Sequence, residues 1–238
     1  MLALERGAYR ARLADREDQP RVQALRDRAF GARIGPGARD ADEFDARCRH
    51  IVVEHRASGG LMCCFRVMQI AAGADIGRCY SAQSYDLSRL AEFPEPMIEI
   101  GRFCTAPEAY DPDVLRLAWG AITRLVDEWG AGLLFGCSSF DGADPTRHAP
   151  ALSRLRASLA PSRWMPGRKA AETVDFALPV AGTAALPPLL RTYLAMGGWV
   201  SDHAVLDRAL NTLHVFTGLE IAKVPAARAR ALRALVQG

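Results

Sequence analysis

The segment Met97–Cys104 reads MIEIGRFC, an apolar run that carries a carboxylate at Glu99 and a guanidinium at Arg102. A short run of apolar residues of this kind predicts a buried β-strand. A strand in a protein core normally excludes both charges, because burying either one without a partner is costly. We therefore expect that the fold or the function of the protein uses Glu99 and Arg102.

The composition is that of a globular protein. The chain has 238 residues, of which 50% are hydrophobic, and its net charge is +3. Proteins that bind duplex nucleic acid carry a much stronger basic surface, so we expect no nucleic-acid partner. No apolar run is long enough to span a bilayer, and the N-terminus MLALERGAYR has charges where a signal peptide has its apolar segment. These features predict a cytoplasmic protein.

The six cysteines form no CxxC pair, and several lie in apolar runs such as LMCCFRV (61–67) and LLFGCSSF (133–140). Cysteines in apolar, strand-like surroundings are typical of buried reduced thiols. We therefore expect neither a metal site nor a disulfide framework.

The N-terminal part of the chain predicts a strand, a helix and a hairpin. Residues 9–14 alternate as a strand does, and residues 15–31 have helical spacing that we expect to end at Gly31. Residues 50–70 predict two antiparallel strands that turn at Ser58–Gly60.

The helix that follows MIEIGRFC has clear start and stop signals. Asp111 is placed to cap it, Pro112 suits its first turn, and Gly130 suits its end. Its predicted apolar face consists of Leu115, Ala118, Trp119, Ile122 and Val126.

Short helices and strands alternate along the remaining segments. We expect short helices at 80–96 and 186–198, a helix near 151–160, strands at 132–140 and near 172–179, and two strands around an acidic turn at 199–221. The order predicts an α/β domain with a mixed sheet in residues 1–180. Residues 181–238 are then a C-terminal elaboration packed on the same domain.

Several standard sites are absent from the sequence. It has no GxGxxG after a strand, no GxxxxGK[ST] and no HExxH. The segment GCSSF (136–140) lacks the second glycine of a nucleophile elbow, so Ser138 and Ser139 are weak nucleophile candidates. What remains is a set of charged and aromatic residues near the predicted strands, namely Arg26, Phe30, Asp42, Asp45, Arg66, Glu99 and Arg102. Taken alone, each of these charges is more often a structural ion pair or cap than a functional group.

Together, these residues resemble the acyltransferases of the N-acetyltransferase (GNAT) fold that use acyl carrier protein as donor, among them the acyl-homoserine lactone synthases. The strand Glu99–Phe103 (EIGRF) is similar to their E-[IL]-S-R-F, with glycine in place of serine, and DADEFD (40–45) is similar to their acidic link. The resemblance implies a mixed, mostly antiparallel central sheet flanked by helices.

The sequence is more similar to the L-ornithine N(alpha)-acyltransferases, the first enzymes of ornithine lipid synthesis. The segments that carry this resemblance are DEFDARCRHIVV (42–53), CYSAQSYDLSRL (79–90), IEIGRFC (98–104), LLFGCSSFDGADP (133–145), LPPLLRTYLAMGGWVSD (186–202) and AVLDRALNT (204–212). The sequence departs from the family near His203 and His214, which bears on the acceptor amine.

The resemblance implies transfer of a 3-hydroxylated fatty acyl group from the thioester of acyl carrier protein to the α-amine of ornithine. The donor is then the acyl-phosphopantetheine of the carrier protein, with no permanently bound cofactor and no metal. A protonated amine cannot attack a thioester, so a carboxylate must take its proton. Glu99 is the candidate base, and the competing interpretation is that Glu99 only pairs with Arg102.

The other candidate residues have expected roles in substrate binding. Arg102 would organise Glu99 or bind the substrate carboxylate, with Arg26 and Arg66 as second candidates. Asp42 and Asp45 would attract the cationic substrate, and their alternative role is to cap the link before the hairpin. Backbone N–H groups near Phe103 or in Gly136–Ser138 would meet the oxyanion. Phe30, Cys137 and Ser138 complete the predicted substrate-binding set.

Charge points to the same donor. Coenzyme A users of this fold place a glycine-rich pyrophosphate loop where this chain has CTAPEAYDPDV (104–114), with acids and prolines. Between Pro145 and Ala171 there is no acid, and the basic residues there are Arg147, Arg154, Arg156, Arg163, Arg168 and Lys169. Because acyl carrier protein is acidic, this stretch is a candidate docking surface. The alternative is an ordinary solvated helix face.

Three alternatives stay open at this level. The acceptor is another amino acid such as glutamine, the protein is an acyl-homoserine lactone synthase, or it is a non-catalytic module that binds carrier protein or membrane. Because the product is a lipid, we also expect peripheral contact with the inner membrane through an exposed Trp164–Met165 or the apolar helix at 186–196. That helix has packing in the core as its alternative.

Overall fold

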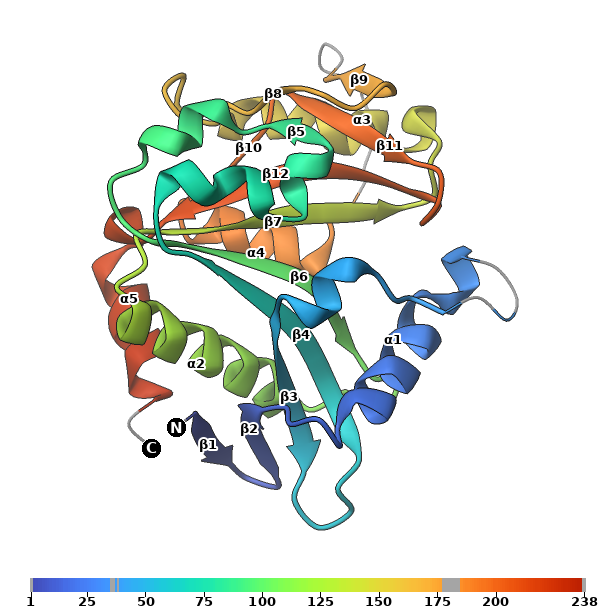
Figure 1. Ribbon diagram of the computed structural model, residues 1–238, viewed down its shortest axis with the longest axis vertical. Helices are drawn as coiled ribbons and strands as arrows, with labels where there is room; N and C mark the ends of the chain where they lie inside the picture. The colour runs from blue at the N-terminus through green and yellow to red at the C-terminus, as the bar shows by residue number, and fades with distance from the viewer. Residues whose placement is uncertain (1, 35–36, 38, 177–184, 237–238) are drawn as a thin grey trace. The chain divides into compact units, whose positions relative to one another are not determined.

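The computed structural model describes residues 2–34, 37, 39–176 and 185–236 (Figure 1). Contacts between residues group the chain into two units. The first contains Met1–Gln69, Ile100–Ala131 and Ala226–Gly238, and the second contains Ile70–Glu99 and Gly132–Pro225. The boundary expected between residues 180 and 181 lies outside the described residues and stays a prediction.

The first unit is built on antiparallel strands. Its strand order is β1 (Ala3–Arg6), β2 (Tyr9–Leu13), β3 (Arg49–His55), β4 (Leu61–Ile70) and β6 (Met97–Thr105). The pairs from β1 to β4 are antiparallel. The predicted hairpin is therefore confirmed as β3 and β4, and the predicted strand MIEIGRFC is confirmed as β6.

Helix α1 (Gln19–Ile34) packs Val22 and Leu25 against Val52 of β3 and Cys64 of β4. The prediction that this helix ends at Gly31 is wrong. A glycine that stops a helix usually has a positive φ, and Gly31 is not among the described residues with that conformation.

Helix α2 (Pro112–Trp129) confirms the predicted signals. The Asp111 carboxylate accepts a hydrogen bond from the N–H of Asp113, and Gly130 ends the helix with φ 60°. The predicted apolar face is wrong at Leu115, which is 44% exposed. Ala118, Ile122 and Val126 of the predicted face are buried as expected, together with Leu117 and Leu125. Helix α5 (Ala226–Ala234), which the pattern did not predict, contacts α2 and pairs Arg233 with Asp127.

The second unit also contains strands, beginning with residues 97–99 of β6. Its strand order is β6, β7 (Leu133–Asp141), β12 (Thr212–Glu220), β11 (His203–Asp207) and β9 (Thr173–Asp175), with β10 (Trp199–Val200) also paired to β12. The pairing of β6 with β7 is parallel, and the others are antiparallel. This confirms a mixed, mostly antiparallel sheet.

Helices α3 (Pro145–Leu155) and α4 (Pro188–Ala195) lie against one face of this part of the sheet (Figure 1). Leu152 and Leu155 of α3 and Leu190 of α4 are in one core cluster with Leu213 and Val215 of β12. The short proline-opened helix predicted in the tail is thus confirmed as α4.

The opposite face of the sheet in the second unit carries aromatic side chains. Phe216 of β12 stacks on Phe135 of β7 and on Trp199 of β10, and Tyr85 meets its edge. Tyr85 belongs to β5 (Tyr85–Asp86), which pairs with β8 (Gly167–Arg168). The connection around β5 consists of the 3-10 helices η2 (Gly73–Arg78), η3 (Ser81–Gln83) and η4 (Ser88–Glu92).

Candidate active site

A closed ring of ion pairs lies in the first unit. Arg26 comes from α1, Arg66 from β4 and Arg102 from β6, and the acids are Asp40, Asp42 and Asp45, in and before the 3-10 helix η1 (Glu43–Ala46). Arg26 binds Asp40 at 2.9 Å and Asp45 at 2.5 Å. Arg66 binds Asp45 at 2.7 Å and Asp42 through both terminal nitrogens, at 2.5 and 2.8 Å. Arg102 closes the ring on Asp42 at 3.2 Å and Asp40 at 2.9 Å.

The local structure of η1 holds two of these acids in place. The Asp42 carboxylate accepts the N–H of Phe44, and the Asp45 carboxylate accepts the N–H of Asp42, which is a capping box. The predicted capping role of Asp42 and Asp45 is therefore confirmed. Both carboxylates also bind arginines, Asp42 through Arg66 and Arg102 and Asp45 through Arg26 and Arg66.

The ring is buried, and its arginines keep the pKa values of two of its acids low. The side chains of Arg26, Arg66 and Asp40 are at most 3% exposed. Burial by itself would raise the pKa of Asp45, but hydrogen bonds from Arg26 and Arg66 outweigh it and lower that pKa to about 2. The pKa of Asp42 is lowered in the same way, against its burial, by Arg66 and Arg102. The ring combines three guanidinium groups with three carboxylates, and the lowered pKa values keep Asp42 and Asp45 ionised at neutral pH.

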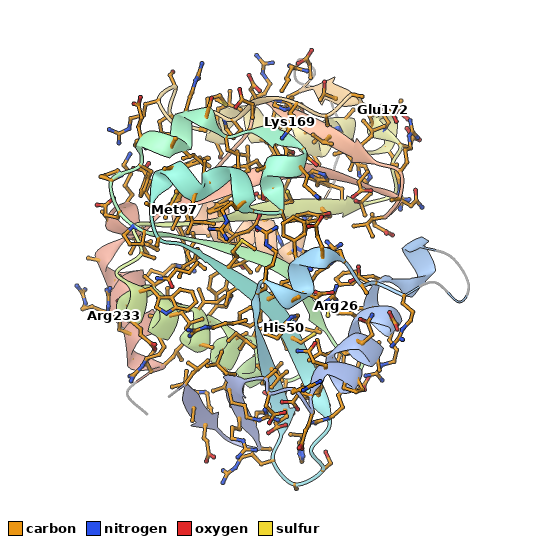
Figure 2. The ribbon with its side chains drawn as sticks, viewed as in Figure 1. Arg26, His50, Met97, Lys169, Glu172 and Arg233 are labelled. Carbon is orange, nitrogen blue, oxygen red and sulfur yellow. The ribbon has the colours of Figure 1, made fainter. Side chains whose placement is uncertain are left out.

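His50 of β3 lies at the edge of the ring, with Nε2 3.1 Å from the carbonyl oxygen of Asp45 (Figure 2 labels His50 and Arg26). Burial lowers the pKa of His50. The imidazole is therefore neutral when the protein is folded at neutral pH and adds no charge to the ring.

The backbone of β6 is unusual at Arg102, which has φ 51° although it is not glycine. A left-handed conformation at such a residue costs on the order of 1–3 kcal/mol and persists only where the surroundings impose it. Here, the side chain of Arg102 is held by its bonds to Asp40 and Asp42. The neighbouring residue, Gly101, has little room for a side chain, because a Cβ atom there would lie 3.3 Å from Nε of Arg66.

Glu99 of β6 is 4% exposed and belongs to the second unit. Its Oε1 accepts hydrogen bonds from the N–H and the hydroxyl of Ser81, at 2.7 and 2.6 Å. Its Oε2 accepts the N–H of Tyr80 at 2.9 Å. Three donors from one short segment therefore surround the carboxylate and stabilise its negative charge.

Two thiols lie near Glu99. Sγ of Cys137 is 3.5 Å from Oγ of Ser81. Burial, and to a smaller extent the charge of Glu99, raise the pKa of Cys79. Cys79 is therefore a protonated, unreactive thiol at neutral pH.

The remaining predicted substrate-binding residues lie in different surroundings. Phe30 packs on the core cluster of the first unit that contains Val22 and Leu25, and Phe103 stacks on Phe65 with ring centroids 5.1 Å apart. Ser138 follows Cys137 on β7 but points to the opposite face, where its hydroxyl accepts a hydrogen bond from Thr217 at 2.9 Å. The structure thus brings the three arginines together with Asp42 and Asp45, and Glu99 together with Cys137.

Sequence reasoning missed Asp40, Tyr80 and Ser81 as parts of these clusters. Asp40 opens the acidic link DADEFD, whose first aspartate was not singled out. Tyr80 and Ser81 act on Glu99 mainly through backbone N–H groups, which leave no signature in side-chain chemistry.

All six basic residues of the predicted docking surface are exposed. Two of them also have acidic partners, because Arg163 pairs with Glu220 and Arg168 with Asp175. Nη1 of Arg156 donates to the carbonyl oxygen of Phe176 at 3.0 Å, and Nζ of Lys169 donates to that of Ala82 at 2.6 Å. Whether these residues bind a partner stays a prediction.

The expected exposure of Trp164 is wrong. Its side chain is 8% exposed and packs on Phe93, with ring centroids 5.0 Å apart. Leu190 and Tyr193 of α4 are also buried, so the alternative of packing in the core holds for them. In the part of the chain that the structure describes, no helix has the length and apolarity needed to cross a membrane.

Comparison with known proteins identifies the family. Residues 25–120 match the model of the acetyltransferase (GNAT) domain. In fold, the chain is similar to FeeM, an N-acyl amino acid synthase from uncultured soil microbes, with a TM-score of 0.51 and 11% identity over 96% of this chain and 97% of that one. This likeness shows a shared acyltransferase fold, as predicted.

Two relatives are more similar in sequence. The L-ornithine N(alpha)-acyltransferase of Rhizobium meliloti (strain 1021) is 32% identical over 85% of this chain and 76% of its own length. That of Brucella abortus (strain 2308) is 31% identical over 92% of this chain and 86% of its own length. With this identity across most of both relatives, the chain belongs to the L-ornithine N(alpha)-acyltransferase family, as the sequence motifs predicted.

Proposed function

We propose that this protein transfers a 3-hydroxylated fatty acyl group from the phosphopantetheine thioester of acyl carrier protein to the α-amine of L-ornithine. The amine nitrogen forms a bond to the thioester carbon, the carbon–sulfur bond breaks, and the thiol of the carrier protein leaves with a proton. The product is a single-chain ornithine lipid. Membership of the family supports the reaction, and the buried carboxylate of Glu99 supports the mechanism.

We assign the role of general base to Glu99. The attacking amine must lose a proton, and a carboxylate within hydrogen-bond reach of the amine is a suitable acceptor. The donors from Tyr80 and Ser81 fix the orientation of the carboxylate, which favours a defined geometry of proton transfer. Backbone N–H groups near Phe103 or in Gly136–Ser138 are the proposed donors to the oxyanion.

We assign a structural role to the ion-pair ring. Each of its acids contacts two arginines, and each arginine contacts two acids, so the ring has no net charge to attract an ammonium group. Its position around Arg102 supports the view that it fixes the conformation of β6. Direct contact of Asp42, Asp45 or the arginines with ornithine stays a prediction.

We propose that the acidic carrier protein docks on the basic stretch of the second unit. Arg147 and Arg154 are exposed on α3, and Arg156 is exposed directly after it. Exposed charges of one sign accelerate encounter with a partner of the opposite sign. Reversal of charge at Arg154 and Arg156 is therefore expected to raise the KM for acyl carrier protein and leave the KM for the amine unchanged. An unchanged KM for the carrier would indicate an ordinary solvated surface.

The experiment that tests the proposed function is a mass-spectrometric assay with 3-hydroxyacyl carrier protein and separate samples of ornithine, glutamine and S-adenosylmethionine. We expect N-acyl ornithine. Acyl glutamine would keep the reaction and change the acceptor, a lactone would indicate a signal synthase, and no product from a folded protein would indicate a binding module.

The same assay tests the base. Glu99→Gln keeps the size of the side chain, replaces one of its two acceptor oxygens by an NH2 group and cannot take the proton, so we expect a loss of about 10²–10⁴-fold in kcat. Glu92→Gln, at an exposed glutamate of η4 in the same unit, is the matched control and should keep full activity. Near-normal turnover of Glu99→Gln would refute the assignment.

A further inference from the structure

Three donors to the Glu99 carboxylate lie in one short segment, Tyr80–Asp86, which we name the clamp segment. Two donors are backbone N–H groups, so the position of the backbone itself determines where the carboxylate is held. A change in a distant side chain that moves this backbone therefore changes the geometry of Glu99 without touching it.

The clamp segment has little regular structure of its own. It contains only the three-residue helix η3 and the two-residue strand β5. Elements this short are not stable alone, because each closes at most one or two backbone hydrogen bonds. Contacts to the rest of the second unit must hold the segment in place.

Tyr85 provides the contact to the sheet. Its side chain is fully buried, and its hydroxyl lies 3.0 Å from the carbonyl oxygen and 3.2 Å from Nδ1 of His214 on β12. Burial raises the pKa of Tyr85, so the hydroxyl keeps its proton and donates to the carbonyl oxygen. The ring also lies against those of His203, His214 and Phe216, with centroids 5.3–5.6 Å apart.

Lys169 and its neighbours provide the second contact. Tyr85 pairs with Arg168 in the sheet of β5 and β8, and the N–H of Ala170 donates to the carbonyl oxygen of Ser84 at 3.0 Å. Nζ of Lys169, labelled in Figure 2, donates to the carbonyl oxygen of Ala82 at 2.6 Å. Ala82 directly follows Ser81, so this ammonium group binds the backbone one residue from the donors to Glu99.

We propose that the clamp segment sets the geometry of the Glu99 carboxylate, and that Tyr85 and Lys169 are positioning residues that hold the clamp segment in place. This inference rests on the proposed function, in which Glu99 is the base. It assigns Lys169 a role different from that of the other basic residues of the docking surface. Loss of Lys169 lowers kcat, whereas loss of Arg154 and Arg156 raises the KM for the carrier protein.

The test measures kcat and both KM values for Tyr85→Phe and Lys169→Met. Each substitution removes one net hydrogen bond from the clamp segment, which corresponds to about a fivefold to tenfold loss of kcat. We expect both KM values to stay within about twofold of the wild type, because the proposal gives neither residue a contact with a substrate. Lys169→Arg keeps a cationic donor and should restore most of kcat. Tyr193→Phe, at a buried tyrosine of α4, is the matched control and should keep full activity.

A double-variant comparison separates positioning from general damage to the fold. If Tyr85 acts through Glu99, Tyr85→Phe should change the residual rate of Glu99→Gln by less than about twofold, because effects through one group are not additive. A loss of the same size in both backgrounds would overturn the inference, as would unchanged kcat in both Tyr85→Phe and Lys169→Met. If Tyr85→Phe does not fold, the comparison of Lys169→Met with Lys169→Arg tests the inference by itself, because Lys169 is exposed and its substitution should not prevent folding.

The two proposals fail in different ways. Normal activity of Glu99→Gln would refute the proposed base. An inactive Glu99→Gln together with normal kcat in Tyr85→Phe and Lys169→Met would refute the clamp and leave the proposed function intact.

Discussion

Replacing Arg66 by methionine opens the ion-pair ring at its most buried member. Arg66 makes three hydrogen bonds to Asp42 and Asp45, and its side chain is 2% exposed. Removing one partner of a buried ion pair costs about 3–5 kcal/mol, because the other partner stays buried without compensation. Here Asp42 keeps Arg102 and Asp45 keeps Arg26. We therefore expect the lower end of that range, about 3 kcal/mol of unfolding free energy.

Urea denaturation combined with hydrogen exchange measures this loss. Exchange of peptides from β3 and β4 reports the opening free energy of the first unit separately from the second. The matched control is Arg6→Met, which breaks the pair of Arg6 with Asp113, where Arg6 is 48% exposed. An exposed pair contributes about 0–1 kcal/mol, so this variant should remain close to the wild type.

A second comparison isolates the pair itself. Arg66→Met combined with Asp42→Asn removes both charges, so the double variant should be less destabilised than the sum of the single variants by about 1–2 kcal/mol. The reasoning is refuted if Arg66→Met costs no more than Arg6→Met, because the ring would then contribute nothing beyond a surface ion pair.

Three further predictions follow from buried groups. Asp45 has a pKa of about 2 in the folded protein against an ordinary 3.8, so its contribution of about 2 kcal/mol is complete above pH 4. It should disappear as the pH falls from 4 to 2, and denaturation of Asp45→Asn should show a weaker pH dependence in that interval. Gly218→Ala places a Cβ atom 2.4 Å from the ring of Trp199, so we expect a loss of about 1–3 kcal/mol of unfolding free energy, measured by urea denaturation. Trp164→Ala removes the ring that packs on Phe93 and should lower the free energy of unfolding by about 3–5 kcal/mol, measured by thermal denaturation. Binding to anionic vesicles should be unchanged.

The parts of the fold that could be predicted from sequence are those determined by local interactions. The cap, the first-turn proline and the terminal glycine of α2 all act within a few residues of the helix end. The hairpin of β3 and β4 likewise joins neighbours in sequence. Gly31 shows the limit of such signals, because a glycine ends a helix only when the chain turns there, and α1 continues to Ile34.

The candidate site depended on contacts between distant residues. Family motifs identified five members of the ring, but Asp40 and Arg102 are 62 positions apart, and no local pattern predicts that they meet. The donors to Glu99 were harder to predict, because two of the three are backbone N–H groups, which leave no signature in the sequence. Trp164 was misjudged because charged neighbours suggested a surface, whereas its ring points inward while Arg163 beside it stays exposed.

The presence of two opposite charges in one apolar strand has a physical explanation in these contacts. Each charge has its own set of partners: backbone and hydroxyl donors for Glu99, aspartates for Arg102. The left-handed residue Arg102 interrupts the alternation of β6, and Gly101 leaves room for Arg66 beside it. A left-handed residue that is not glycine persists only where its surroundings hold it, and the side chain of Arg102 is held by Asp40 and Asp42. The ring thus accounts for the charge of Arg102 in the first unit, and the donors from Tyr80 and Ser81 account for the charge of Glu99 in the second, so each charge of the segment MIEIGRFC has its own partners.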